Sequence, residues 1–246
     1  MLIIPAIDLK DGKVVRLFQG EYSREKIYSV DPVQVARQWK QEGAKLIHVV
    51  DLDGAACGRP KNLEVVAAIL KEAKVRVEFG GGVRSEETIK KVLKMGVFRV
   101  VIGTLALENY KALYKLAKKY KDKLLVSLDV KNDGSIATRG WKKKLTNNNN
   151  LADIAKNLAS AGIKRIVYTD IERDGTLGGL RLNLLSVNLN ILSKYKLSTI
   201  IAGGVSTTKD ILNIRSLALD NKIEGVIVGK ALYEGRFNLK EALKIA

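Results

Sequence analysis

Histidine, cysteine and long apolar segments are scarce in this sequence, and each shortage excludes a class of protein. Cys57 is the only cysteine, so no internal disulfide forms, and with no base beside it we expect a packing residue. His48 is the only histidine, which rules out a metal site with two histidine ligands, and no cysteine cluster replaces them. No apolar run reaches the roughly 18 residues that cross a bilayer, and no basic segment precedes the first one. We therefore expect a cytoplasmic protein without a metal.

Charge of one sign dominates, with a formal net charge of +17 at pH 7. Such an excess can mark a protein that binds nucleic acid. The lysines, however, are scattered through segments that read as helices, and there is no dense basic arm, no aromatic stacking series and no known nucleic-acid module. We expect a solvated basic surface and no specific nucleic-acid partner.

Short apolar segments rich in valine and isoleucine alternate with amphipathic segments along the chain. This alternation indicates parallel strands covered by helices. The sequence contains no dinucleotide fingerprint after the first strand, which favours a closed barrel over an open doubly wound sheet. We predict a single (β/α)8 TIM barrel over residues 1–246. Its strands are expected at 2–7, 46–51, 75–79, 99–102, 124–128, 165–169, 198–202 and 224–228, and its helices at 32–43, 63–73, 110–120 and 151–161 and after residues 85, 183, 207 and 238. A short ribbon at 13–17 is expected to lead into a polar loop at 19–26, and another loop is expected at 52–60.

The second half of the chain repeats the first. The opening strand ends in Asp8 and the strand halfway along ends in Asp129, and each aspartate is followed by a lysine and an Asp-Gly turn. Glycine pairs after the third and seventh strands, and single glycines after the fourth and eighth, recur at a similar separation of about 120 positions. The repeat predicts two half-barrels, at about 1–122 and 123–246, related by a pseudo-twofold axis.

The repeated glycines lie where a barrel binds phosphate. Glycine at the end of a strand lets backbone N–H groups approach an anion at a helix N-terminus. One loop of this kind is equally well explained as a tight turn, but four in a symmetric arrangement favour two phosphate sites on opposite sides of one mouth. The candidate residues are Gly82, Arg84, Gly103 and Thr104 in the first half, and Gly203, Gly204, Gly229 and Lys230 in the second.

Asp8 and Asp129 are the candidate catalysts. Both follow apolar strands, so burial should raise the pKa of each carboxyl, and both are expected at the rim where barrel enzymes keep their reactive groups. A general acid and a general base would then face each other across one mouth. Asp51 and Asp170 occupy equivalent places in the two halves and compete for the role. Asp11 and Asp133 read as turn residues.

His48 and Trp141 each leave two interpretations open. His48 is either a packed, orienting residue or a substrate contact. Trp141, in a loop with Arg139, either stacks on a heterocycle or covers the barrel mouth as a hydrophobic lid.

Several short segments spread along the chain match one known family. They are Ile4–Leu9, Gly12–Arg16, His48–Leu52, Gly80–Ser85, Gly140–Trp141, Thr169–Ile171, Arg173–Leu177 and Ala202–Ser206. Taken together, and nearly end to end, the chain resembles the phosphoribosylformimino-aminoimidazole carboxamide ribotide isomerase family of histidine biosynthesis.

The resemblance implies an Amadori rearrangement of an aminoaldose ribosyl phosphate to an aminoketose, without metal or cofactor. It makes Asp8 the proton acceptor at the sugar C2 and Asp129 the proton donor that opens the furanose ring, with Thr169 assisting. It also adds Gly175 and Thr176 to the substrate-binding residues. The expected partner is a small-molecule bisphosphate substrate, bound by a monomer.

Two features keep alternatives open. The segment Val130–Gly134 after the second aspartate is closer to the sister cyclase subunit, and Gly178–Arg181 is not the usual continuation of the Thr-Leu motif. The alternatives are the glutaminase-dependent cyclase, an isomerase that also acts on phosphoribosylanthranilate, and a basic binding protein without enzymatic activity. Ala6-Ile7, Leu17–Tyr22 and Gly140-Trp141 favour the isomerase.

Overall fold

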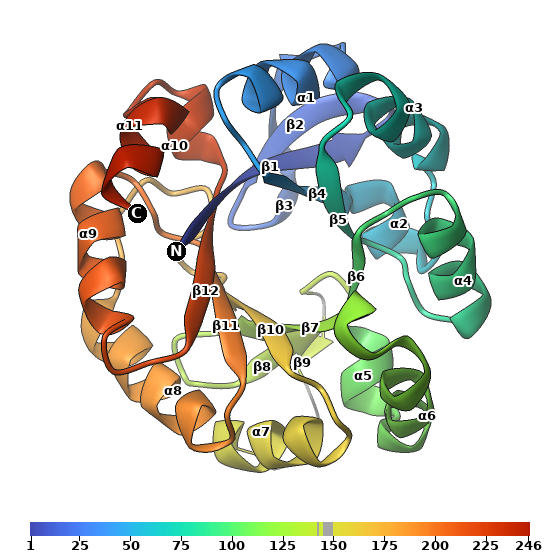
Figure 1. The fold of residues 1–246 in the computed structure, drawn as a ribbon, viewed down its shortest axis with the longest axis vertical. Coiled ribbons are helices and arrows are strands. Elements are labelled where there is room, and N and C mark those ends of the chain that lie inside the picture. The colour runs from blue at the N-terminus through green and yellow to red at the C-terminus, as the bar shows by residue number, and fades with distance from the viewer. Residues whose placement is uncertain (142, 145–149) are drawn as a thin grey trace.

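A closed ring of parallel strands forms the centre of the molecule (Figure 1). The computed structural model describes residues 1–141, 143–144 and 150–246. Neighbouring strands pair around the ring, and β7 pairs with β10 to close it. In spatial order the ring strands are β1 (Leu2–Lys10), β4 (Leu46–Asp51), β5 (Arg76–Gly80), β6 (Arg99–Ile102), β7 (Leu124–Val130), β10 (Arg165–Asp170), β11 (Ser198–Ala202) and β12 (Ile223–Val228). The predicted (β/α)8 barrel is confirmed.

Helices surround the ring, and most begin at the residues that the sequence marks as caps (Figure 1). Asp31 directly precedes Pro32, the first residue of its helix, and its side chain accepts a hydrogen bond from the Gln34 N–H. Ser85 caps the helix that follows the first glycine pair. Thr207 caps the helix expected after it. The outer helices are α1 (Pro32–Gln41), α3 (Leu63–Ala73), α4 (Glu86–Lys94), α6 (Tyr110–Tyr120), α7 (Leu151–Ser160), α8 (Leu182–Lys194), α9 (Thr208–Leu217) and α11 (Leu239–Ile245).

Two apolar layers hold the barrel together. The larger lies between the strands and the helices, and the smaller fills the inside of the ring. Since side chains alternate along a strand, every ring strand except β5 contributes to both layers, which explains their continuous apolar sequences. The inner layer consists of Ile4, Ala6, Leu46, Val101, Leu125, Val167, Ile200, Ala202 and Ile227. Within the described ranges, no helix is both long and apolar enough to cross a membrane.

The prediction of a polar loop at 19–26 is wrong. β2 (Lys13–Phe18) and β3 (Glu21–Ser29) form an antiparallel hairpin on β1, with the turn at Gln19–Gly20. Most of β3 is exposed on both faces, so it lacks the apolar alternation that reveals a half-buried strand. Backbone pairing with β2 and side-chain contacts, such as those of Tyr22 with the Leu52 carbonyl and of Lys26 with Glu234, hold it instead.

Three short helices follow ring strands and were not predicted. α2 (Leu52–Cys57) lies inside the expected loop at 52–60, and α5 (Thr104–Glu108) begins directly after β6. Its counterpart in the second half, α10 (Lys230–Tyr233), begins directly after β12. These segments are too short to show a helical period, so their sequence carries little signal. They matter because they bring backbone N–H groups to the carboxyl ends of the strands, where the site lies.

Candidate active site

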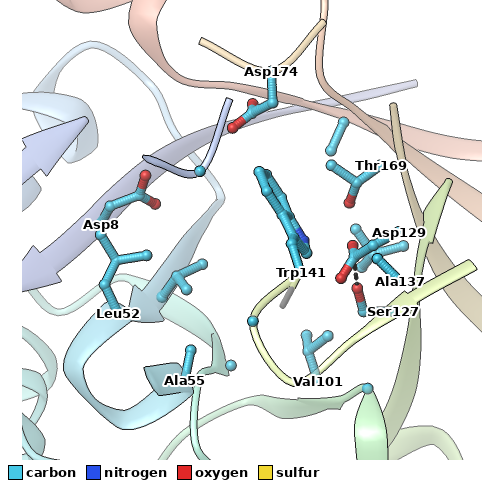
Figure 2. A pocket seen from close by; sticks show the side chains of 18 of the residues that line it. Asp8, Leu52, Ala55, Val101, Ser127, Asp129, Ala137, Trp141, Thr169 and Asp174 are labelled. Carbon is cyan, nitrogen blue, oxygen red and sulfur yellow. Dashed lines mark hydrogen bonds between the residues drawn. The ribbon is translucent and has the colours of Figure 1, made fainter. Parts of the chain in front are cut away.

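A cavity of about 220 Å³ opens at the carboxyl ends of the ring strands. Asp8 from β1 and Asp129 from β7 enter it from opposite sides, and Asp174 from the loop after β10 lies at its edge (Figure 2). Three strands, β4, β5 and β6, separate β1 from β7 in one direction around the ring, and β12, β11 and β10 separate them in the other. The two carboxyls are therefore as far apart around the rim as the barrel allows, with one space between them.

Asp8 is held by a cation. Burial raises the pKa of its carboxyl, and the Arg16 guanidinium beside it opposes that shift. Arg16 Nη1 lies 2.7 Å from Asp8 Oδ2, and its side chain is 7% exposed. Arg16 comes from β2, which pairs with β1 so that Val15 lies opposite Asp8. The β1–β2 hairpin thus supplies the positive charge that favours an ionised Asp8.

Asp129 is held by neutral donors. Burial raises the pKa of its carboxyl, and hydrogen bonds from the Ser127 hydroxyl, the Thr169 hydroxyl and the Trp141 indole oppose that shift. The Ser127 Oγ lies 2.8 Å from Asp129 Oδ1. In the part of the chain that the structure describes, no lysine or arginine forms an ion pair with Asp129. The two aspartates match in sequence, but their electrostatic settings differ.

Asp174 is a third carboxyl of the site, and its role was missed in the sequence. Burial raises its pKa, with Arg16 opposing the shift. Arg16 Nη2 lies 3.7 Å from Asp174 Oδ1, so one guanidinium interacts with two carboxyls. The only sequence signal was the position of Asp174 in the Arg173–Leu177 motif shortly after a strand end.

The glycines predicted for the first phosphate site line the main cavity. Gly103 caps α5 with φ −111° and ψ −89°, and Thr104 is the first residue of that helix. Gly82 and Arg84 line the same cavity. Arg84 is also used in packing, since one guanidinium nitrogen lies 2.9 Å from the Ala55 carbonyl oxygen, to which it donates a hydrogen bond.

A smaller cavity of about 30 Å³ gathers the residues predicted for the second phosphate site. Gly229 caps α10 with φ −109° and ψ −102°, nearly the same backbone conformation as Gly103. Gly175, Gly203, Gly204 and Lys230 line this cavity, and Arg16 and Asp174 line both cavities. Lys230 Nζ donates to the Gly175 carbonyl at 2.7 Å.

Thr176 lines neither cavity. Its hydroxyl donates to the Arg173 carbonyl at 2.9 Å and accepts from the Gly178 N–H at 3.1 Å. Thr176 therefore shapes the loop after β10 and is not brought to the phosphate-binding residues with which it was grouped.

Asp51 and Asp170 are both used by the scaffold. Asp51 is fully buried and accepts hydrogen bonds from the backbone N–H groups of Gly54, Lys61 and Asn62. Asp170 forms a two-pronged ion pair with Arg181, with the guanidinium Nε at 2.6 Å. These partners explain why two aspartates at strand ends line neither cavity. The ion pair with Asp170 also gives the segment Gly178–Arg181 a structural role, because Arg181 fastens the end of the loop after β10 to that strand.

His48 and Trp141 both line the main cavity. His48 is 8% exposed, and its Nδ1 lies 2.8 Å from Glu78 Oε1, so it is packed and also accessible from the cavity. Trp141 stands between Asp8 and Asp129 (Figure 2), where it hydrogen-bonds to Asp129. Its ring lies against Gly20, where an added Cβ would come within 2.1 Å. Trp141 therefore occupies the space between the two carboxyls, and both interpretations of its role stay predictions.

Comparison with known proteins identifies the family. A family model described as "Histidine biosynthesis protein" matches residues 2–238. A protein of Moorella thermoacetica is 43% identical over 246 residues, which are 100% of this chain and 98% of that protein. A protein of Dehalococcoides mccartyi is 44% identical over 243 residues, 98% of this chain and 95% of that protein. One of Synechocystis is 42% identical over 244 residues, 99% and 93% of the two chains.

All three relatives are named as isomerases of an imidazole carboxamide that carries a phosphoribosyl and a phosphoribosylamino-methylideneamino group. The names give no support to the cyclase or to action on phosphoribosylanthranilate. The model covers almost the whole chain, and the relatives match it from end to end. The chain therefore belongs to the histidine biosynthesis protein family.

Proposed function

We propose that this protein is an aldose–ketose isomerase that carries out a cofactor-free Amadori rearrangement in histidine biosynthesis. Its substrate is the phosphoribosyl-formimino-aminoimidazole carboxamide ribonucleotide, and its product is the phosphoribulosyl isomer. One observation carries the proposal: two partly buried carboxyls face each other across one cavity, one beside a cation and the other beside neutral donors only. A nearby cation favours the ionised form, which acts as a base, and a carboxyl without one keeps its proton more readily and acts as an acid.

The chemistry needs one proton delivered and one removed. Asp129, protonated, gives its proton to the furanose ring oxygen, and the ring opens to a Schiff base between the sugar C1 and the amine. Asp8, ionised beside Arg16, then removes the proton from C2, and the electron pair moves toward the nitrogen to form an enaminol. The enaminol becomes the aminoketose when its hydroxyl loses a proton and C1 gains one. Thr169 assists by hydrogen-bonding to Asp129.

The two phosphate sites position the substrate. Each half of the chain, 1–122 and 123–246, supplies one carboxyl and one glycine-lined site, so a ligand with a phosphate at each end spans the rim with its sugar between the carboxyls. A substrate that reaches both carboxyls takes the place of the Trp141 indole. All of these groups come from one chain, and we propose a monomer with no nucleic-acid partner.

Turnover without metal is the direct test. The purified protein should convert the aminoaldose bisphosphate to the aminoketose at an unchanged rate when a metal chelator is added. With the aminoketose and ammonium salts it should form no imidazole, whereas a cyclase would. Activity lost with the chelator, or imidazole formation, would contradict the proposal.

Gly103→Ala tests the first phosphate site. An added Cβ would meet only the Ser127 Cβ, at 3.9 Å, and φ at this position is negative, so the fold accommodates alanine. The methyl group would take space from a phosphate oxygen at the start of α5. We expect KM for the bisphosphate to rise about tenfold, a loss of roughly 1.4 kcal/mol of binding, with the free energy of unfolding nearly unchanged.

Gly96→Ala is the matched control for that variant. Gly96 has open space around it but a φ of +100°, and it lies in the turn between α4 and β6, outside both cavities. Alanine there should lower the free energy of unfolding by about 1 kcal/mol and leave KM unchanged. If both variants changed KM equally, the assignment of a phosphate site at Gly103 would be wrong.

A further inference from the structure

A buried carboxylate, Glu78, lies directly beneath the active-site cavity. His48 on β4, Glu78 on β5 and Arg99 on β6 are neighbours in the strand register, with His48 opposite Glu78 and Glu78 opposite Arg99. Glu78 is fully buried, and its two oxygens have different partners. Oε1 lies 2.8 Å from His48 Nδ1, and Oε2 accepts from Arg99 Nε at 2.9 Å.

Arg99 links Glu78 to a second group of charged side chains, formed by Glu224 and Arg165. Arg99 Nη1 donates to Glu224 Oε1 at 2.5 Å, and Arg165 Nε donates to Glu224 Oε2 at 2.6 Å. Arg99 therefore bridges two carboxylates and balances the charge of Glu78, which would otherwise be buried alone. Glu224 belongs to the same network but has no contact with His48 in the described ion pairs and hydrogen bonds. Glu78 alone joins the network to the imidazole.

This arrangement decides which ring nitrogen of His48 carries a proton. A carboxylate oxygen accepts hydrogen bonds and has nothing to donate, so Nδ1 must be the protonated nitrogen at 2.8 Å. No described residue hydrogen-bonds to Nε2, and His48 lines the cavity. The carboxyls of Asp8 and Asp174 line the same cavity as His48.

We propose that Glu78 is a positioning residue for the isomerase: it holds His48 as the Nδ1–H tautomer and so presents Nε2 to the sugar as a hydrogen-bond acceptor. The ligand group is a hydroxyl of the ribosyl moiety, which can donate to a neutral imidazole nitrogen. The inference rests on the proposed function for its ligand, but the tautomer itself is a property of the free protein. Glu78 acts only through His48 and makes no contact with the reacting atoms.

The single histidine makes the tautomer directly measurable. In protein labelled with a nitrogen isotope at histidine, NMR gives the two ring nitrogens of His48 without assignment. At about pH 9, well above the usual imidazole pKa of about 6.5, the wild-type ring should show a protonated Nδ1 and an unprotonated Nε2. In Glu78→Gln the side-chain amide can turn either its oxygen or its NH2 to the ring, so the Nε2–H tautomer should appear.

Activity measurements separate positioning from stability. We expect Glu78→Gln to lower kcat/KM about tenfold or more, as loss of an orienting partner typically does. Glu224→Gln is the matched control, because it removes a carboxylate from the same network without touching His48. It should lower the free energy of unfolding while kcat/KM and the tautomer stay as in the wild type.

A double-mutant cycle completes the test. His48→Asn removes the Nε2 position, and in that background Glu78→Gln should cause no further loss of kcat/KM if Glu78 works through His48. Additive losses, an unchanged tautomer in Glu78→Gln, or an Nε2–H tautomer in the wild type would each overturn the inference. Failure of the proposed function would look different, since wild-type protein would then lack turnover while NMR still reported the Nδ1–H tautomer.

Discussion

Asp8→Asn is expected to lower kcat by about a thousandfold, the middle of the range for removing a positioned acid or base. Asparagine keeps the size of the side chain and can still interact with Arg16, but it cannot accept the C2 proton. The phosphate sites lie on other strand ends, so substrate binding should persist. Steady-state kinetics gives kcat, and calorimetry with the unreacted substrate gives the dissociation constant.

Asp11→Asn is the control for this variant. Asp11 lies just beyond the same strand in an exposed turn with φ 48°, a conformation that asparagine tolerates. It should have wild-type kinetics. A kcat for Asp8→Asn within tenfold of the wild-type value would remove Asp8 as the base.

The pH dependence of the wild type follows from the same assignment. A base works when ionised, so activity should fall on the acid side as Asp8 gains a proton. Burial raises the pKa of Asp8, which places this fall above the ordinary carboxyl value of 3.8. An acid works when protonated, so activity should fall on the alkaline side as Asp129 loses its proton. The alkaline limb should therefore be absent from a variant without Asp129.

The ring and its helices were predictable because their signals are local. Asp31-Pro32 marks a helix start by itself, and the apolar run before Asp129 marks a strand covered on both faces. β3 was not predictable, because its stability comes from backbone pairing with β2 rather than from an apolar face. Elements with buried apolar faces leave a pattern in the sequence, and an element held by backbone pairing and scattered side-chain contacts does not.

The candidate site was predictable only in part, for a related reason. Repetition located Asp8 and Asp129 at equivalent strand ends, but it makes the two halves look alike. What distinguishes them is the Arg16 side chain, which reaches Asp8 because the β1–β2 hairpin folds back along the first strand. Asp174 joins the site through a loop, and Asp51 is withdrawn from it by three backbone donors. Which aspartates enter the site, and which cation lies beside each, depends on contacts between residues that are distant in the sequence.

Asp129→Asn is expected to lower kcat by about a thousandfold and, at neutral pH, to make the protein more stable. Burial raises the pKa of Asp129 above 3.8, so the folded state binds a proton more tightly than the unfolded state does. The stability of the wild type therefore falls as pH rises from about 4 through the raised pKa. Asparagine carries no charge to bury, so it escapes this loss. Urea unfolding at about pH 4 and about pH 8 should show the gain only at the higher pH.

Asp174→Asn distinguishes Asp129 from the other carboxyl that could deliver the proton. Both carboxyls are partly buried, but Asp174 lies 3.7 Å from Arg16, which favours its ionised form, whereas Asp129 accepts only from neutral donors among the described residues. Asp129 is therefore the better acid at neutral pH, and Asp174→Asn should lose less activity while keeping the alkaline limb of the pH profile. If Asp174→Asn lost that limb and Asp129→Asn kept it, the proton donor would be Asp174, and the strand end of β7 would serve only to bind the sugar.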